Sequence, residues 1–446
     1  MLAVVVTATL AITWWLPAYR LSSARASWQP PPDAMLASSM REQPAPGWRT
    51  NVAELGMPRN VGSQLAVSSD ERNLQPFIGN IGANAYFLAS TEEADGSQWW
   101  LVGIDVHSGR PLFGAVPLGS GKQVPDCFLN GPTQILCLDG VPSKVAWVID
   151  GRSGEVGYSG PTDLQRNFGT LTVRQVGIYA VATNQNEGAF GIGSQAETTW
   201  FVPGDGRLQI EPPTRPSASS QTLTAQDDVD PMSWSATVFS VADGRVIEPD
   251  LDDGSTLIDT VFYTGGFAAE VDSPDAKRSS IMFFDDSGKR VGEHGEEGVL
   301  ERDEDPIDLP VVWSEDRSIV YSAQGQKLIE VPGSASQLVG TTLMANLANS
   351  REFPEWQQYN LRDGTAGPVC DYPMHNYLGT DGSTLVFEVT NRNAELLAKA
   401  HDLNSCERLW TLPKQPDSLD RIWNIDGTLV QLANEGTELL SLVAPG

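Results

Sequence analysis

The sequence predicts an all-β fold: a seven- or eight-bladed β-propeller preceded by a hydrophobic N-terminal helix, either an anchor or a signal. Two observations predict the propeller. An apolar stretch, a turn rich in Asp, Ser and Gly, and a second apolar stretch recur eight times, with turn positions 37 to 52 residues apart. Such spacing in an all-β chain is typical of propeller blades. In addition, no long stretch shows apolar residues at helical spacing.

Each repeat is interpreted as strand, turn and strand. Val, Ile, Trp, Phe and Tyr dominate the apolar stretches and fit a half-buried pleated surface. Gly accepts positive φ, and a short Asp side chain bonds the backbone ahead of it, which closes an antiparallel hairpin. The repeats are Leu101–Phe113, Val145–Tyr158, Thr199–Ile210, Thr237–Ile247, Ile281–Val291, Ile319–Ile329, Tyr359–Val369 and Ala398–Trp410. Their turn positions are Gly109, Gly154, Gly206, Gly244, Gly288, Gly325, Gly364 and Cys406.

Residues 1–19 carry no charged side chain and are mostly apolar, which is about the roughly 20 residues that a membrane-spanning helix needs. We prefer an uncleaved membrane anchor with the propeller outside the cytoplasm. The alternatives are a signal peptide cleaved after Ala24-Arg25-Ala26, which gives a secreted protein, and a buried apolar end of a soluble protein. Arg20 and Arg25 follow the segment, and the positive-inside rule alone would place the domain in the cytoplasm.

The remainder divides into a tether and a propeller. Residues 20–60 are rich in Pro, Ser and Ala and predict an extended extracytoplasmic tether, so the propeller spans residues 61–446. The polar, Pro/Ser-rich stretch Pro212–Asp230 predicts a mobile insertion in the fourth repeat, which leaves the blade number at seven or eight. The tail Arg421–Val443 has strand character, and we expect it to pair with Val61–Ala66 and close the ring.

Four cysteines form two candidate pairs. Cys127 and Cys137 flank a short hairpin symmetrically, and Cys370 and Cys406 lie in consecutive repeats. Two disulfides would indicate an oxidising compartment, whereas four unpaired, partly buried thiols are the alternative. No Cys-x-x-Cys or paired His spacing favours zinc, and we assign no metal site.

The chain is strongly acidic, with a net charge of −28. Residues 1–60 hold five basic and three acidic groups, or +2, so the remainder carries −30. Such a surface repels DNA, RNA and anionic lipid. The densest acidic run, Glu293–Asp308, is interpreted as a docking patch for a basic partner, a loose Ca²⁺ site or a solvated loop. Residues 250–254 resemble a calcium loop in composition only.

The search for catalytic motifs is mostly negative. The sequence contains no phosphate-binding loop and no nucleophile elbow. The four histidines are scattered, and His107 and His401 are interpreted as turn residues; the other two are His294 and His375. We predict core positions between blades for Trp99, Trp100, Trp147, Trp200 and Trp410. The sequence therefore assigns no catalytic and no cofactor-binding residue.

Three repeats resemble the PQQ-like β-propeller repeat, in which Asp-x-x-Ser/Thr-Gly is followed by an aromatic residue. They are Asp105-Val-His-Ser108-Gly109 with Phe113, Asp150-Gly-Arg-Ser153-Gly154 with Tyr158, and Asp402-Leu-Asn-Ser405-Cys406 with Trp410. That family contains quinone-dependent dehydrogenases and non-catalytic scaffolds similar to the assembly factor of the outer-membrane β-barrel machinery. The chain lacks the adjacent cysteines of the dehydrogenases, so the resemblance implies the non-catalytic branch and no cofactor. It also lacks the lipid-acceptor Cys of the assembly factor.

These observations favour a non-catalytic, membrane-anchored, extracytoplasmic propeller that binds or scaffolds envelope proteins as a monomer. We expect its loops, above all Pro212–Asp230 and Glu293–Asp308, to contact the partner. The alternative is a hydrolase or lyase that acts on a lactone or a cell-envelope glycan in the central channel. It would need His375 or His401 beside two carboxylates. A sensor ectodomain is a third hypothesis.

Overall fold

A computed structural model provides the structure. It describes residues 21–30, 35–59, 62–65, 76–93, 96–140, 142–166, 171–210, 220–230, 235–274, 279–295, 298–301, 307–347, 355–390, 395–414 and 420–446. The chain divides into two compact units. Unit 1 comprises residues 1–32, 248–374 and 404–406, and unit 2 comprises residues 33–247, 375–403 and 407–446.

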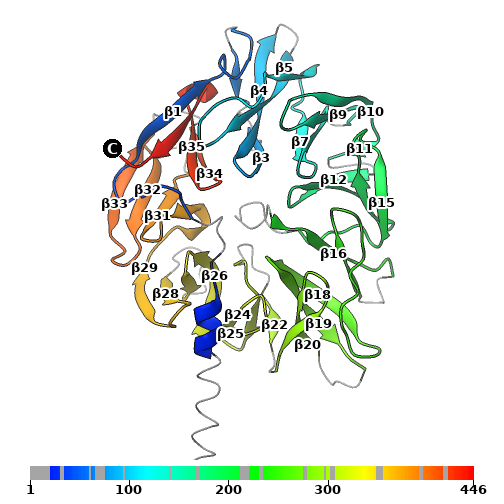
Figure 1. Ribbon diagram of the computed structural model, residues 1–446, viewed down its shortest axis with the longest axis vertical. Helices are drawn as coiled ribbons and strands as arrows, with labels where there is room; N and C mark the ends of the chain where they lie inside the picture. Colours follow the sequence, from blue (N-terminus) through cyan, green and yellow to red (C-terminus); the bar gives the residue numbers. More distant parts are fainter. Residues whose placement is uncertain are drawn as a thin grey trace, which may run out of the picture. The chain divides into compact units, whose positions relative to one another are not determined.

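The all-β, propeller-type prediction is confirmed, because the strands of the described residues form successive sheets that are antiparallel except for one short parallel pair, Leu164–Gln165 with Leu171–Thr172 (Figure 1). Eight sheets have four or five strands, which agrees with the upper blade count. A two-stranded sheet brings the number among these residues to nine. Its second strand belongs to the counted repeat Thr237–Ile247, and the sheet without a counted repeat is the one that the tail Arg421–Val443 forms with Ala45–Asn51.

Unit 1 contains three four-stranded sheets in which neighbouring strands follow one another in sequence. The first holds β18 (Thr256–Tyr263), β19 (Gly266–Asp272), β20 (Ser280–Asp285) and β21 (Arg290–His294). The second holds β22 (Val299–Leu300), β23 (Val311–Ser314), β24 (Arg317–Tyr321) and β25 (Lys327–Pro332). The third holds β26 (Ser334–Val339), β27 (Thr342–Asn346), β28 (Trp356–Asn360) and β29 (Ala366–Cys370).

Unit 2 contains the other six sheets. The first holds β2 (Gln64–Leu65), β3 (Phe77–Ile81), β4 (Asn84–Glu93), β5 (Gly96–Asp105) and β6 (Val116–Gly121). The second holds β7 (Asp126–Leu129), β8 (Gln134–Leu138), β9 (Val145–Asp150) and β10 (Val156–Pro161). The third holds β11 (Leu164–Gln165), β12 (Leu171–Val176), β13 (Tyr179–Asn184), β14 (Gly188–Ile192) and β15 (Thr198–Pro203), and the fourth holds β16 (Leu223–Asp227) and β17 (Ala236–Ser240).

The remaining two sheets of unit 2 come from the C-terminal part of the chain and one early strand. One holds β30 (Tyr377–Thr380), β31 (Thr384–Glu388), β32 (Leu396–Asp402) and β33 (Arg408–Pro413). The other holds β1 (Ala45–Asn51), β34 (Arg421–Ile425), β35 (Thr428–Ala433) and β36 (Glu438–Val443). The 3-10 helices η3 (Met374–Asn376) and η4 (Asn434–Gly436) are single turns, so helix is as rare among these residues as the sequence predicts.

All eight predicted turn positions have positive φ, between 63° and 86°. Five of the repeats are the predicted strand, turn and strand. In Leu101–Phe113 and Thr237–Ile247, the turn is followed by a single bridge residue, Pro111 or Val246, and not by a strand. The repeat Thr199–Ile210 is different, because the hairpin of its sheet turns at residues 193–197, before β15. The segment after Gly206 leaves that sheet, and its Gln209 N–H donates to the Ala225 carbonyl oxygen of β16 at 2.9 Å.

Strand β1 corrects the prediction for the ends of the chain. The tail does close a sheet, but its β36 pairs with β1, with Thr50 opposite Leu439 (Figure 1). The predicted partner range Val61–Ala66 instead supplies β2, whose Leu65 lies opposite Ala89 of β4. The tether prediction for residues 20–60 is therefore wrong for Ala45–Asn51.

Two further parts of the predicted tether pack against sheets. In unit 1, residues 21–27 are helical, Ala24 and Trp28 are buried beside Leu328, and the Arg25 Nε–H donates to the Leu328 carbonyl oxygen at 2.6 Å. In unit 2, Leu36 and Met40 are buried. Both side chains pack in one hydrophobic cluster with residues of β31, β32 and β33.

The predicted insertion is also partly folded. Within Pro212–Asp230, residues 211–219 lie outside the described part of the chain. The segment that follows contains β16, whose first four residues are buried and which pairs with β17 along its whole length. The prediction of a mobile loop is therefore wrong for Leu223–Asp227.

The predicted N-terminal helix, residues 1–19, lies outside the described residues. Across the residues that are described, no helix is both long enough and apolar enough to cross a membrane.

Candidate functional site

The turn carboxylates form the most regular polar feature of the surface. The Asp105 Oδ1 accepts hydrogen bonds from the Ser108 N–H at 2.8 Å and the Ser108 hydroxyl at 2.7 Å, and Asp150 repeats the arrangement with Ser153. These hydrogen bonds lower the pKa of both carboxyl groups. Because both carboxylates accept hydrogen bonds within their own turns, they stabilise the hairpins. Their geometry does not point to a catalytic role.

Aromatic side chains cover the glycines of several turns. A Cβ on Gly109 would lie 2.5 Å from the Trp48 ring of β1, and a Cβ on Gly154 would lie 2.7 Å from the Phe113 ring. Trp200 covers Gly244 in the same way. Trp48 and Trp200 lie in strands of other sheets, and Phe113 lies in the connection between β5 and β6. Glycine is therefore required at these turns both for φ and for close approach.

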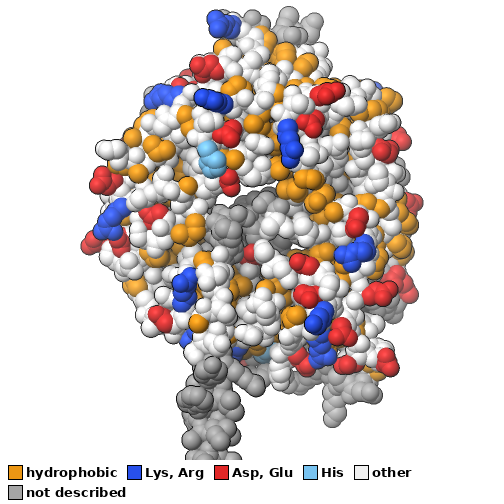
Figure 2. Space-filling model, in the orientation of Figure 1, with side chains coloured by type: hydrophobic (Ala, Val, Ile, Leu, Met, Phe, Trp, Pro, Cys, Tyr) orange, Lys and Arg blue, Asp and Glu red, His pale blue; other side chains and the backbone are white. Residues whose placement is uncertain are grey.

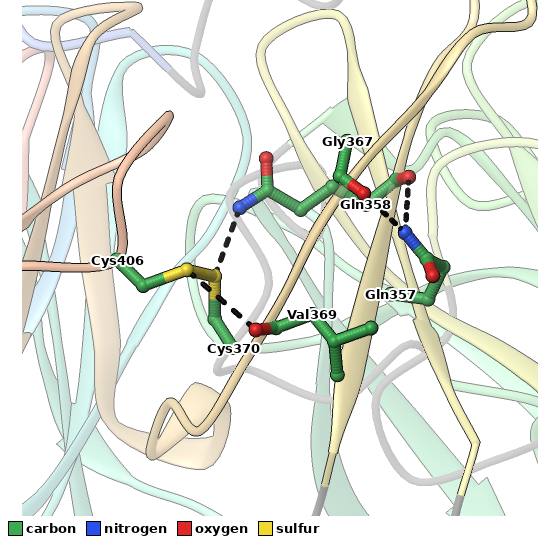
Figure 3. The surroundings of a disulfide bond; sticks show 6 residues. All are labelled: Gln357, Gln358, Gly367, Val369, Cys370 and Cys406. Atoms are coloured by element: carbon green, nitrogen blue, oxygen red, sulfur yellow. Dashed lines mark hydrogen bonds between the residues drawn. A yellow bond between two sulfur atoms is a disulfide. The ribbon is translucent and has the colours of Figure 1, made fainter.

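The last turn replaces this contact with a covalent bond. Cys406, at φ 63°, is bonded to Cys370 at the end of β29, with the Cα atoms 5.7 Å apart (Figure 3). The Gln358 side-chain amide donates to the Cys370 sulfur at 3.3 Å, and the Cys406 sulfur lies 3.7 Å from the Val369 carbonyl oxygen. A side chain at the αL position is thus tied to the preceding sheet where other turns have glycine.

The second predicted pair is also at disulfide distance. Cys127 of β7 lies directly opposite Cys137 of β8, with Cα atoms 4.1 Å apart, and the two are bonded. The neighbouring Asp126 is buried and pairs with Arg166. Burial is the largest influence on Asp126 and raises the pKa of its carboxyl group despite that guanidinium.

The side chains of three histidines are described, and each of them contacts side chains of neighbouring residues. His107 lies in the predicted turn, 3.1 Å from the Asp426 carboxylate. His294 is buried, with Nδ1 2.6 Å from the Tyr321 hydroxyl. The turn prediction for His401 is wrong, because it belongs to β32 and its ring packs edge-on against Phe387. The side chain of His375 lies outside the described part.

The acidic run Glu293–Asp308 is described at its two ends. Glu293 forms an ion pair with Arg290, and the Asp308 Oδ1 accepts a hydrogen bond from the Thr264 N–H at 2.7 Å. Residues 296–297 and 302–306, which hold most of the acidic side chains, are outside the described ranges. In the calcium-like stretch, Asp252 lies 3.6 Å from Arg290. The described residues contain no group of three His, Cys, Asp or Glu that could hold a metal ion.

Acidic side chains are spread over the face shown in Figure 2 and do not form one compact patch. Among the exposed large apolar side chains of the described residues, one is aromatic: Phe201 of β15, which is 52% exposed and stacks on Phe190 at 4.7 Å. Phe201 lies in the predicted repeat Thr199–Ile210, for which the sequence predicts no binding role, and an uncharged strand alone does not distinguish an exposed edge from a buried strand.

The chain matches one protein family over nearly its whole length. Residues 20–445 match the conjugation-associated 9-bladed beta-propeller domain. The chain belongs to this family. Its nine blades agree with the nine sheets formed by the described residues, including the sheet of β1 and β34 to β36 that the repeat count missed.

An uncharacterized protein of Mycolicibacterium smegmatis (strain MKD8) is 39% identical over 436 residues, which cover 94% of this chain and 89% of that protein. Solved structures are more distant. BamB from Moraxella catarrhalis is 9% identical with a TM-score of 0.33, covering 90% of this chain and 100% of its own. The V. cholerae biofilm matrix protein Bap1 is 8% identical with a TM-score of 0.29, covering 92% and 90%.

Proposed function

We propose that this chain is a non-catalytic protein-binding module of a conjugation apparatus, held at the outside of the cell membrane. The observation that carries the proposal is the family match, which extends over residues 20–445 and describes a conjugation-associated propeller. The match covers the sheets and the short segments before them, so the proposal concerns the propeller as a whole.

The charge favours a protein partner over the transferred DNA. With a net charge of −28, the chain repels phosphate backbones, whereas it attracts basic protein surfaces. We therefore propose a basic protein of the same apparatus as the partner. The predicted contact segments, Pro212–Asp230 and Glu293–Asp308, remain candidates for this contact.

The cysteines support an extracytoplasmic site. Both predicted pairs are at disulfide distance, and disulfides persist in oxidising compartments. We propose that residues 1–19 anchor the domain to the membrane; secretion after cleavage is the alternative.

A donor strain that lacks the gene tests the proposal. We expect transfer of a conjugative element to fall sharply, with normal growth, and to recover when the gene is restored. A second strain would carry a chain with residues 211–219 shortened and Asp303, Glu304 and Asp305 changed to Asn or Gln. Unchanged transfer without the gene would contradict the conjugation role. If the altered chain of the second strain still binds its partner protein at the normal level in a pull-down, the two segments are excluded as the contact.

The absence of catalysis has its own test. Purified protein is expected to leave lactones and cell-envelope glycans unchanged. Hydrolysis or elimination that His401→Ala abolishes would instead establish the enzymatic alternative.

A further inference from the structure

We propose that the free edge of β15 is a docking edge that binds an extended, apolar β-strand with basic ends, contributed by a partner protein. The inference rests on the proposed function, because it names the surface through which a protein-binding module would act. Strand addition to a sheet edge draws affinity from main-chain hydrogen bonds and specificity from side-chain contacts.

β15 differs from the other strands that end the sheets. Natural edge strands avoid unwanted pairing through charge, proline, glycine or irregularity. Among the described edge strands, β1, β21, β25 and β33 carry charged residues, and β6, β10 and β29 contain Gly or Pro within the strand. β15 (TTWFVP) has no charge, and its one proline is its last residue. The described edge strands β17 (ATVFS) and β26 (SASQLV) also lack charge, Gly and Pro, but β15 differs from both in its exposed aromatic side chain, Phe201.

The geometry of β15 suits strand addition. Among the described strands it pairs with β14 alone, in regular register from Phe201 to Pro203. The Gly204 N–H donates to the Glu187 carbonyl oxygen, and hydrogen-bonded pairs alternate along an antiparallel ladder. Phe201 therefore falls in a non-hydrogen-bonded pair with Phe190, and its own N–H and C=O point away from β14.

The side chain of Phe201 provides an anchor beside those backbone groups. It is 52% exposed and stacks on Phe190 at 4.7 Å with an interplanar angle of 29°. The stacking fixes the ring, so a partner strand would bury a preorganised aromatic surface. Aromatic anchors of this kind carry much of the energy of protein interfaces.

Charge selects the occupant. The exposed Glu197 precedes β15, so this end of the edge is acidic, and the chain carries a net charge of −28. Lys or Arg beyond the ends of an added strand would complement this acidic surface. A second copy of this chain would offer the same uncharged strand and a further charge of −28, which disfavours self-association.

A peptide-binding experiment on the full chain tests the edge directly. The probe is a fluorescent Lys-Lys-Thr-Val-Thr-Val-Thr-Val-Lys-Lys peptide, and the control probe has proline at its central valine. We expect saturable binding of the first probe alone. Phe201→Ala and Thr199→Lys should each weaken it about tenfold or more, because they remove the anchor or charge the edge. Val369→Ala, which changes a side chain 48% exposed on β29, should leave binding unchanged.

Equal urea midpoints for the variants show that they are folded. Absence of probe binding, equal binding of the proline probe, or equal loss in Val369→Ala would overturn the inference, as would a dimer in sedimentation that Thr199→Lys dissociates. Transfer assays separate this inference from the proposed function. If gene deletion stops transfer but Phe201→Ala and Thr199→Lys do not, the docking edge fails and the function stands. If deletion leaves transfer normal while the probe binds as expected, the function fails and the edge stands.

Discussion

At the scale of single residues, the left-handed turn position decides which side chains a repeat accepts. Gly109, at φ 70°, faces the Trp48 ring, whereas Gly82, at φ 57°, has no atom within 4 Å of a Cβ. We expect Gly82→Ala to cost about 1–2 kcal/mol, the penalty of a left-handed alanine. Gly109→Ala should cost about 1–3 kcal/mol more, because its methyl group must displace the indole. Urea unfolding followed by circular dichroism measures both, and equal losses would show that the ring yields freely.

At the last turn, Cys406 occupies a left-handed position that strains the backbone of a non-glycine residue. Its bond to Cys370 compensates this strain. Removing the disulfide should cost about 4 kcal/mol for a loop of 36 residues. Once the bond is gone, glycine is the better residue at φ 63°. We expect Cys370→Ser/Cys406→Gly to be more stable than Cys370→Ser/Cys406→Ser by about 1–2 kcal/mol. Thermal unfolding of the two double variants decides, and a more stable serine variant would contradict the argument.

At the scale of elements, local pairing could be predicted from the sequence and distant pairing could not. Hairpins such as β9–β10 can be predicted from an Asp/Ser/Gly turn between two apolar stretches. β1 contains Pro46 and Gly47, alternates poorly, and finds its partner β36 at the other end of the chain. β16 was hidden by the polar composition of the residues around it. Its burial comes from β17 and residues 205–209, which its own sequence does not reveal.

The segment before β1 supplies the test at this scale, because a solvated tether and a packed strap respond differently to mutation. Met40 is 1% exposed, the Trp410 indole N–H donates to its carbonyl oxygen at 2.7 Å, and Glu42 nearby is exposed. We expect Met40→Ala to lower the free energy of unfolding by about 2–5 kcal/mol, the cost of a buried large-to-small change. Glu42→Ala should change it by less than about 0.5 kcal/mol. Equal, negligible effects in urea titrations would restore the tether interpretation.

At the scale of the whole molecule, repeat spacing and charge were accessible from sequence, and the candidate docking edge was not. The eight turn positions lie in or beside eight of the nine sheets of the described residues, and the acidic excess is the basis for the proposed basic partner. An edge becomes visible only when the pairing of every strand is known, because a sequence such as TTWFVP is equally compatible with a buried strand. Only the 52% exposure of its side chain distinguishes Phe201 from the aromatic residues of the core.

The pH dependence of stability is a property of the whole molecule, because two effects of opposite sign contribute to it. Between pH 7 and the isoelectric point of 4.4, lowering the pH relieves self-repulsion in the compact state, so stability should rise. Below it, the turn carboxylates dominate. Hydrogen bonds to serine hydroxyls and backbone N–H groups lower the folded-state pKa of Asp105, Asp150 and Asp285. A lowered pKa gives stability that is fully present above the unfolded-state value, about 3.9, and is lost as pH falls through the folded-state value.

We therefore expect the urea midpoint to rise from pH 7 to about pH 4.5 and to fall steeply below about pH 4, because the turn carboxylates are protonated there. Salt at 0.5 M should flatten the upper limb, because it shortens the Debye length to about half its value at physiological ionic strength. Asp105→Asn/Asp150→Asn should flatten the lower limb, since two of the titrating carboxyl groups are removed. Asp253→Asn, at an exposed position before β18, is the matched control and should leave the lower limb unchanged. A midpoint that is constant from pH 5 to pH 3 would show that the turn carboxylates do not couple folding to protonation.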